Sequence, residues 1–276
     1  MTAALRAGGK ALSQAGIEGG ARDLRLLMAH VLGIEAARMT LYLQDKLPAA
    51  AAAAFEALVV RRMAREPVSH LIGRRAFFGR AFSVTADVLD PRPETEALVL
   101  AALERPFERV LDLGTGSGCI LLTLLCEQAS ARGVGADLSG AALEIFALNR
   151  AALGLEARAG SCLSDWYEGL SQARGPYDLI VSNPPYVPDA ETPNEPEVQN
   201  HDPRLALYGG EDGLDVIRVL AEAASMALRP GGVVMLEHSN LQGAAVRNVL
   251  ESHGFRTVST EQDLVGRDRF TQGYRP

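Results

Sequence analysis

Four consecutive residues, Asn183, Pro184, Pro185 and Tyr186, could do chemistry on a planar nitrogen. They follow the apolar run at residues 179–181, so we expect them at the carboxyl edge of a sheet, where open α/β sheets bind ligands. Proline fixes φ and has no backbone donor, which leaves the Pro184 carbonyl as an acceptor beside the Asn183 side chain. Two acceptors can hold one –NH2 group, and the Tyr186 ring would pack on a planar amide or base and favour an approaching cation. This combination suits transfer of a cationic methyl group to a conjugated nitrogen; a strand end with a packed tyrosine is the simpler alternative.

A glycine-rich loop is the second candidate site. Residues 112–118 read Asp-Leu-Gly-Thr-Gly-Ser-Gly and lie between an expected strand at 109–113 and an expected helix at 120–128. Its glycines permit positive φ and let the backbone approach a ligand closely. The dinucleotide fingerprint requires its third glycine one position later, where Cys119 stands, so a loop for S-adenosylmethionine fits better. A tight strand-to-helix turn without a ligand is the alternative.

Two further residues would contact a cofactor of this kind. Asp137 ends an expected strand at residues 133–137, from where a carboxylate can accept both hydroxyl groups of a ribose. It could instead cap the helix that begins at Ser139. Trp166, the only tryptophan, follows Asp165, and the pair could contact the ring face and the amine of an adenine. A lone tryptophan is more often part of a core, so the core role and the binding role both stay open for Trp166.

The elements that must position these residues form two domains. Residues 1–75 predict a small helical bundle, with helices at 4–15, 21–32 and 48–65. Residues 76–90 predict a β-hairpin linker, and from residue 91 to 276 strand and helix signals alternate, as in a parallel sheet. Residues 188–213 lack periodicity and predict a long loop beside the reaction centre. The other expected elements are strands at 178–182, 232–237, 255–258 and 269–271, a helix opening at 91–96, a helix at 215–228 and a turn at 229–231.

The composition limits the class of protein. The 276 residues suit one large and one small domain, and 47% hydrophobic with 22% charged residues indicates a globular enzyme. The net charge of −7 lacks the basic footprint of phosphate binding, which favours a protein or small-molecule partner. Without a signal peptide or a membrane-spanning run we expect a soluble, unexported protein. The three cysteines and five histidines have no ligand spacing, so we expect free thiols and no metal site.

Taken in order, the motifs resemble those of the bacterial release-factor glutamine methyltransferases, the PrmC/HemK family, over most of the chain. The string at residues 91–96, Pro-Arg-Pro-Glu-Thr-Glu, separates this family from general adenine methyltransferases, which share only the glycine loop and Asn-Pro-Pro-Tyr. One departure is visible, because Asp202-Pro203 stands where members commonly carry Glu-Pro. The shared strings lie at residues 65–67, 72–73, 78–79, 82, 84, 91–96, 112–118, 165–166, 183–186, 206–207, 209–210 and 212–214.

The resemblance implies an α/β fold of the class I S-adenosylmethionine-dependent methyltransferases. This is a Rossmann-like, mostly parallel sheet with an antiparallel C-terminal strand, preceded by a small helical domain that binds the release factor. The implied reaction methylates the side-chain nitrogen N5 of the glutamine in the Gly-Gly-Gln loop of class I peptide chain release factors, modulating translation termination. S-adenosylhomocysteine would be the second product. We expect a cytoplasmic monomer with no membrane or stable nucleic acid partner.

The resemblance also assigns roles to residues. It makes Asn183, Pro184, Pro185 and Tyr186 contacts of the substrate glutamine, and of these Asn183, Pro184 and Tyr186 would act in catalysis. The implied cofactor contacts are Gly114, Thr115, Gly116, Ser117, Gly118, Asp137, Trp166 and Asn183.

Two other functions stay open. An N6-adenine methyltransferase would also act on a planar –NH2, but it would need a flipped base and a basic track for the backbone, and the chain has no dense run of Lys and Arg. A protein that binds the cofactor but has lost catalysis would keep the fold, although intact Asn-Pro-Pro-Tyr and glycine motifs argue against it.

Overall fold

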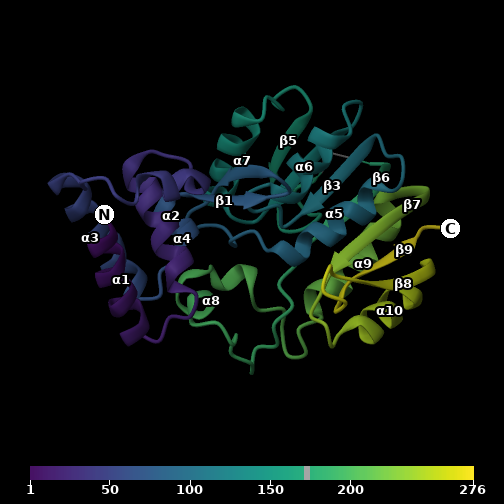
Figure 1. Ribbon diagram of the computed structural model, residues 1–276. Helices are drawn as coiled ribbons and strands as arrows, with labels where there is room; N and C mark the ends of the chain where they lie inside the picture. The colour runs from purple at the N-terminus through teal and green to yellow at the C-terminus, as the bar shows by residue number, and fades with distance from the viewer. Residues whose placement is uncertain (171–174) are drawn as a thin grey trace. The chain divides into compact units, whose positions relative to one another are not determined.

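The computed structural model describes residues 1–170 and 175–276, which divide into two compact units (Figure 1). Unit 1 contains Met1–Arg74 and Asn194–His201, and unit 2 contains Arg75–Pro193 and Asp202–Pro276. Unit 1 is therefore built from two stretches of sequence, the second of which lies inside the expected loop at 188–213. No helix in the described ranges is long and apolar enough to span a membrane.

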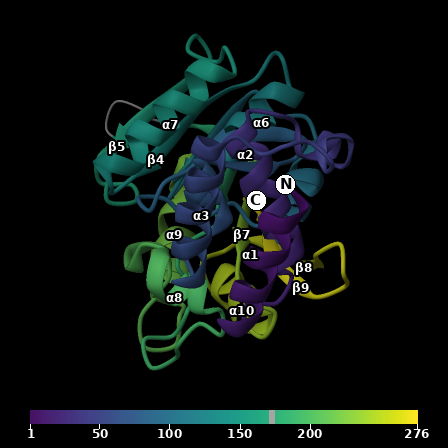
Figure 2. The same cartoon turned by 60° about the vertical axis from the view of Figure 1, so that its left-hand side comes forward.

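Unit 1 is a small helical bundle. Helices α1 (Thr2–Gln14), α2 (Gly20–Leu32) and α3 (Ala49–Met63) pack side by side (Figure 2). Leu12, Leu27, Met28 and Phe55 are buried at their centre. A short α4 (Val68–Ile72) and the 3₁₀ helix η1 (Ala36–Tyr42) complete the bundle. The three predicted helices are confirmed to within two residues at each end.

The second stretch of unit 1 carries the short helix α8 (Pro196–His201). Its Glu197 forms ion pairs with Arg62 Nη2 at 2.9 Å and with Arg65 Nη1 at 3.5 Å, and His201 Nε2 lies 3.3 Å from the Ala64 carbonyl. The prediction of an unstructured loop is therefore wrong at these residues. Six residues with one buried side chain, Val198, are too short to show a helical period, and the ion pairs join positions more than 100 residues apart.

Unit 2 is built on a seven-stranded sheet in the order β5-β4-β3-β6-β7-β9-β8. The first five of its strands along the chain run parallel, and β9, the last strand, runs antiparallel to both of its neighbours. The prediction of a mostly parallel sheet with an antiparallel C-terminal strand is confirmed. The strands are β3 (Arg109–Leu113), β4 (Arg132–Asp137), β5 (Ala159–Leu163), β6 (Tyr177–Ser182), β7 (Leu228–Glu237), β8 (Arg256–Gln262) and β9 (Asp268–Tyr274).

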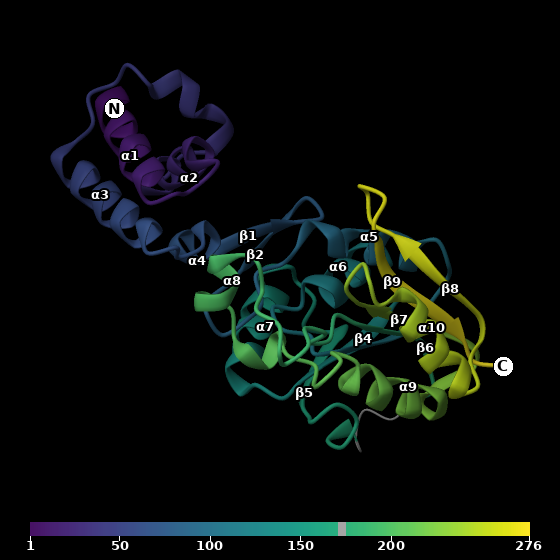
Figure 3. The same ribbon diagram turned by 90° about the horizontal axis from the view of Figure 1, so that it is seen from below.

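Both faces of this sheet are covered by helices, because its central strands are apolar on both sides. Side chains alternate along each strand, so Val110 and Leu179 enter one buried cluster while Leu111 and Ile180 enter the other. The first cluster includes side chains of α5 (Glu96–Leu103), α6 (Cys119–Glu127) and α7 (Gly140–Ala152); the second includes those of α9 (Asp215–Ala227) and α10 (Gly243–Ser252). Figure 3 shows α9 and α10 on the opposite side of the sheet from α5 and α6.

A two-stranded hairpin, β1 (Arg74–Phe77) and β2 (Arg80–Ser83), precedes the 3₁₀ turn η2 (Pro93–Thr95) and α5. Glu96 Oε1, at the start of α5, accepts a hydrogen bond from the Phe78 backbone N–H at 2.8 Å. The hairpin also contacts α7, where Asn149 Oδ1 accepts a hydrogen bond from Ser83 N at 2.7 Å. The Nδ2 of the same asparagine donates to the Ser117 carbonyl of the glycine loop at 2.8 Å. The hairpin and residues 91–96 are thereby tied to the glycine loop.

Two local features differ from the prediction. The turn expected at 229–231 lies inside β7, because the register shifts from Tyr177–Leu228 to Leu179–Val233 and the strand continues past the positive φ of Gly231. The strand β5 is absent from the expected elements, since its Ala-Gly-Ser-Cys-Leu sequence has no β-branched or aromatic residue to indicate a strand.

Candidate functional site

The predicted residues lie together at the point in the sheet where the connections between successive strands reverse direction. After β3 the chain goes to β4 on one side, and after β6 it goes to β7 on the other, so the carboxyl ends of β3 and β6 form a switch point, the usual ligand site of open α/β sheets. A cavity of about 310 Å³ lies at this edge. Its volume is in the range of small-molecule and cofactor sites.

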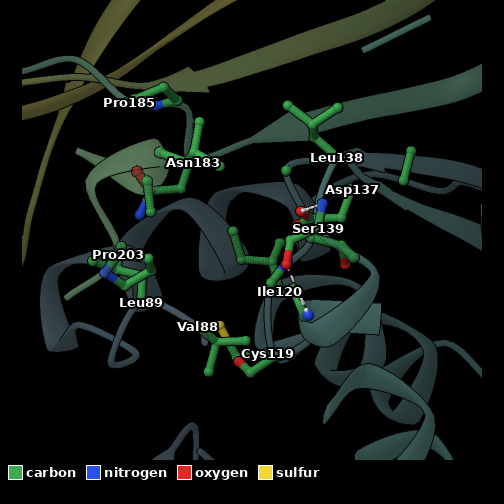
Figure 4. Close-up of a pocket in the computed structure, with 18 of the residues that line it drawn as sticks. Val88, Leu89, Cys119, Ile120, Asp137, Leu138, Ser139, Asn183, Pro185 and Pro203 are labelled. Atoms are coloured by element: carbon green, nitrogen blue, oxygen red, sulfur yellow. Dashed lines mark hydrogen bonds between the residues drawn. The ribbon is translucent and has the colours of Figure 1, made fainter. Parts of the chain in front are cut away.

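Most of the predicted site residues line this cavity, and they lie at or just after the carboxyl ends of four strands, β3, β4, β5 and β6. Figure 4 shows Asn183 and Pro185 on one side of it and Asp137 with Ser139 on the other. Of the predicted residues, Gly118, Pro184 and Tyr186 lie outside the lining. The predicted residues in the lining are Gly114, Thr115, Gly116, Ser117, Asp137, Trp166, Asn183 and Pro185.

The glycine loop is held against the end of β4. The backbone N–H groups of Gly114 and Thr115 donate to the Ala136 carbonyl at 2.9 and 3.0 Å. Gly114 and Gly116 have positive φ, 70° and 54°, which side chains rarely adopt. Gly118 serves packing, because a Cβ there would lie 2.6 Å from the Phe146 ring. The loop therefore faces the cavity with its backbone, because its glycines have no side chains that could fill the space.

Asp137 is oriented by two backbone donors. Its Oδ2 accepts from Gly116 N at 2.8 Å and its Oδ1 from Ser139 N at 2.9 Å. The cap of α7 is Ser139, whose hydroxyl accepts from Ala142 N at 3.2 Å. A carboxylate has about four acceptor sites, so Asp137 keeps lone pairs for hydroxyl donors in the cavity. Of the two roles considered for Asp137, the side-chain helix cap belongs to Ser139.

A second carboxyl group, Asp112, is buried beneath the loop. Its side chain is fully inaccessible, and Thr115 Oγ1 donates to its Oδ2 at 2.7 Å. Burial raises the pKa of Asp112 to about 7, and the bond from Thr115 opposes that rise. Asp112 thus holds the glycine loop through its hydrogen bond from Thr115, and burial makes its carboxyl group harder to ionise.

This burial predicts a pH dependence of stability that the Asp112→Asn variant should lack. Because the pKa in the folded protein exceeds the ordinary value of about 3.9, the folded state binds more protons than the unfolded chain between about pH 4 and 7. Stability from this group is complete below that window and is lost as the pH rises through it. Urea unfolding across the window should show a shallower decline for the variant than for the wild type. Parallel profiles would contradict this.

The Asn-Pro-Pro-Tyr turn leaves two acceptors unused. Ser182, just before it, donates its hydroxyl to the Leu113 carbonyl at 2.6 Å, which ties the end of β6 to β3. Asn183 follows, half-buried and lining the cavity. Within residues 1–170 and 175–276, no hydrogen bond engages the Asn183 side chain or the Pro184 carbonyl. The Asn183 side chain can therefore meet a donor from outside the chain at the cavity, whereas Pro184 is buried and lies outside the lining.

A glycine-rich return segment, residues 207–213, packs backbone to backbone on this turn. Val187 N donates to the Leu207 carbonyl at 2.8 Å, and Gly209 N donates to the Val187 carbonyl at 2.9 Å. A Cβ at Gly209 or Gly213 would come within 3.0 Å of the carbonyls of Pro185 or Tyr186, closer than real Cβ atoms lie. Gly209 and Gly213 are therefore required by the geometry of the Asn-Pro-Pro-Tyr turn.

The Gly213→Ala variant should lose turnover. Gly213 has φ +73° as well as no room for a methyl group, so the substitution should displace the Tyr186 carbonyl, and misplacing a catalytic group by 1 Å can cost roughly 100-fold. Gly154→Ala is the matched control, with φ +67° and nothing within 4 Å. Steady-state kinetics should show reduced turnover for the first variant alone. Equal turnover in both would contradict the steric role.

Most of the remaining lining residues had no signal in the sequence; the exceptions are those in the strings at 91–96, 202–203 and 206–207, and Ser139. Residues 87–89 have no periodicity, and Leu138 and Leu205 stand out only as exposed apolar side chains, 54% and 70% accessible. Asp202, the acid that departs from the family's usual Glu-Pro, forms an ion pair with Arg92, whose Nη2 lies 2.8 Å from Asp202 Oδ2. These lining residues are Asp87, Val88, Leu89, Pro91, Arg92, Thr95, Cys119, Ile120, Ala136, Leu138, Ser139, Ala142, Ser164, Pro203, Leu205, Ala206, Tyr208 and Val216. In the described part of the chain no group of three His, Cys, Asp or Glu side chains could hold a metal ion.

The strand order and the glycine loop define a Rossmann-like methyltransferase fold of class I. Solved structures agree: a methyltransferase from Pyrococcus furiosus matches with a TM-score of 0.55 at 19% identity, covering 80% of this chain and 97% of that one. A 16S rRNA N2 G1207 methyltransferase from T. Thermophilus, in complex with AdoMet and guanosine, matches with a TM-score of 0.52 at 22% identity, covering 74% and 50%. At these identities the likeness establishes the fold.

The chain belongs to the release factor glutamine methyltransferase family. The domain family "PrmC N-terminal domain" matches residues 3–73, and "Methyltransferase small domain" matches residues 86–197. The release factor glutamine methyltransferase of Cereibacter sphaeroides is 50% identical over 274 residues, covering 99% of this chain and 98% of the relative. That of Rhodospirillum rubrum is 45% identical over 262 residues, covering 94% and 80%. The protein is thus an S-adenosylmethionine-dependent methyltransferase, as predicted.

Proposed function

We propose that the protein methylates the side-chain nitrogen N5 of the glutamine in the Gly-Gly-Gln loop of class I peptide chain release factors, and so modulates translation termination. The observation that carries this proposal is a pair of neighbouring acceptors that no described group engages: the Asn183 side-chain oxygen, which lines the cavity, and the carbonyl of the buried Pro184 that follows it. They match the two N–H bonds of a primary amide. The relatives at 50% and 45% identity are named release factor glutamine methyltransferases, which supports the proposal.

An amide nitrogen is a poor nucleophile, because its lone pair is delocalised into the carbonyl. The Asn183 side-chain oxygen and the Pro184 carbonyl would accept its two N–H groups and aim the nitrogen at the methyl group. Bound S-adenosylmethionine supplies that methyl group on a positively charged sulfur. The same two acceptors would stabilise positive charge as it develops on the nitrogen, so proximity and preorganised dipoles provide most of the acceleration.

For the cofactor, we propose that Asp137 accepts the ribose hydroxyls, the loop at 114–118 lies along the ligand, and Trp166 contacts the adenine. Trp166 supports this role by its backbone: it has a φ of 47°, rare for a bulky residue, and its carbonyl is held by the Ser164 hydroxyl at 2.7 Å. Such a conformation persists only where the surroundings impose it. It keeps the indole ring on the wall of the cavity, beside Gly114.

We also propose the division of labour that the sequence predicts. Residues 1–75 bind the release factor, residues 76–90 link, and residues 91–276 carry out methyl transfer, by a cytoplasmic monomer without stable nucleic acid binding. The match of residues 3–73 to a domain family specific in name to this group supports the first assignment. The net charge of −7 supports the last.

A methyl-labelling experiment separates this function from N6-adenine methylation. The purified protein would be offered labelled S-adenosylmethionine with a class I release factor, with duplex DNA and with RNA, in separate reactions. We expect label on the release factor alone. Label on either nucleic acid would overturn the proposal, and cofactor binding without label on any substrate would indicate a protein that has lost catalysis.

A further inference from the structure

A buried carboxyl group, that of Glu237, lies at the end of β7, next to the strand β6 that leads into the Asn-Pro-Pro-Tyr turn. In the parallel pairing of β6 with β7, Ser182 lies opposite Leu236, so Glu237, the last residue of β7, lies one position beyond this pair, where Asn183 leaves β6. Glu237 is fully inaccessible, and neither of its carboxyl oxygens has a hydrogen-bond partner within the described residues. A buried carboxyl group without partners is costly and requires an explanation.

The groups around Glu237 belong to the motifs that define the site. Burial raises the pKa of Glu237 to about 7; the hydroxyls of Thr95 and Tyr186 and the charge of Arg269 oppose that rise, and Glu94 adds to it. Thr95 is itself buried, lines the cavity, and its hydroxyl has no hydrogen-bond partner in the described ranges. Glu237 thus stands between residues 91–96 and residues 183–186, with hydroxyl donors on both.

The backbone of Tyr186 is already fixed from the same edge of the sheet. Gln242 Nε2 donates to the Tyr186 carbonyl at 3.0 Å, and Gln242 Oε1 accepts from Ser239 N at 3.0 Å. Gly213 packs against that carbonyl too. No hydrogen bond of this kind holds the phenol end of Tyr186 among the described residues. The tyrosine is anchored at its carbonyl, with its hydroxyl beside an unpaired carboxyl group.

We propose that Glu237 is a positioning residue for methyl transfer: with substrate bound, its carboxyl group accepts the hydroxyls of Tyr186 and Thr95 and so fixes the turn that carries the Asn183 and Pro184 acceptors. Hydrogen bonds at active sites are often long in the free enzyme and shorten in the substrate complex. The turn must be held closely, because small displacements of reacting groups reduce rates sharply. The inference rests on the proposed function, since the Asn183 and Pro184 acceptors that Glu237 would position are the ones proposed to bind the N–H groups of the substrate glutamine.

The test compares four variants in release factor methylation: Glu237→Leu, Glu237→Gln, Tyr186→Phe and the Glu237→Leu/Tyr186→Phe double. We expect Glu237→Leu and Tyr186→Phe each to lower kcat by roughly 10- to 100-fold, with KM for the release factor and Kd for S-adenosylmethionine changed less than about threefold. Glu237→Gln, which keeps an acceptor oxygen, should restore most of kcat. The double variant should be no slower than the slower single variant, because both changes remove one interaction.

Tyr186→Phe decides the matter if Glu237→Leu fails to fold, since it removes only the hydroxyl. Wild-type kcat in Tyr186→Phe would overturn the positioning role, as would effects that multiply in the double variant or a loss of cofactor affinity that accounts for the loss of kcat. Wild-type protein is assayed alongside. If it methylates the release factor, the proposed function is supported even where the variants overturn the role of Glu237. Absence of wild-type methylation would overturn both.

Discussion

Asn183→Ala is expected to lower turnover by roughly 100- to 1,000-fold, the usual effect of removing one preorganised group that stabilises developing charge. The reason is that Asn183 supplies one of the two acceptors that no described group engages, and the Pro184 carbonyl alone cannot orient both N–H bonds of an amide. The change should fall on kcat and on kcat/KM together, as for an interaction made mainly in the transition state. Steady-state kinetics with a release factor, and calorimetry for cofactor affinity, measure the two effects.

Asn183→Asp is the informative companion, because it keeps an acceptor oxygen at the same position and replaces the amide NH2 group with a second, negatively charged carboxylate oxygen. It should retain more turnover than Asn183→Ala. The affinity for S-adenosylmethionine should change by less than about threefold in the alanine variant, well below the effect on kcat. Near-normal turnover in Asn183→Ala, or a loss explained by cofactor affinity alone, would remove the acceptor role of Asn183.

Asp137→Ala is expected to weaken the binding of S-adenosylmethionine by at least about 100-fold. Hydrogen bonds to a charged acceptor contribute roughly 1.5 to 3 kcal/mol each, and a factor of ten corresponds to about 1.4 kcal/mol. Asp137 would provide such bonds to the ribose, and it also accepts from Gly116 N at 2.8 Å, so its removal loosens the glycine loop. At saturating cofactor, turnover should recover most of its wild-type value. Calorimetric titration gives the affinity.

Asp178→Ala is the matched control for this variant. Asp178 Oδ2 also accepts from two backbone donors, Glu108 N at 2.8 Å and Arg109 N at 2.7 Å, but it lies at the amino end of β6, opposite the cavity. Its removal should lower stability and leave cofactor affinity unchanged. If Asp178→Ala weakened cofactor binding as much as Asp137→Ala, the effect would report loss of structure and the ribose contact would be contradicted.

Much of the fold was predictable because its signals are local. The strands β3 and β6 are apolar on both faces, as a sheet covered by helices requires, and each ends in a polar motif at the same edge. The sequence alone therefore predicts that Asn183, Asp137 and the glycine loop lie together. The identity of the α7 cap was not predictable, because Asp137 and Ser139 both suit that position and only the geometry assigns it to Ser139.

The other features depend on contacts between distant residues. The helix α8 is stabilised by Glu197 with Arg62 and Arg65 and shows no period of its own. Leu205 and Tyr208 reach the cavity only because the return segment folds back on Asn-Pro-Pro-Tyr. Glu237 carried no signal of burial, since a glutamate at the end of an apolar strand ordinarily marks the point where the chain meets solvent, whereas here it is fully buried.

Mass spectrometry tests most directly whether this enzyme modifies the proposed amide. A class I release factor would be incubated with the protein and S-adenosylmethionine, digested, and sequenced by fragmentation, beside a release factor whose Gly-Gly-Gln glutamine is replaced by alanine. We expect one added methyl group on that glutamine, absent from the substituted factor and strongly reduced with the Asn183→Ala enzyme. A methyl group on another residue, or none while the cofactor is demonstrably bound, would contradict the proposed function.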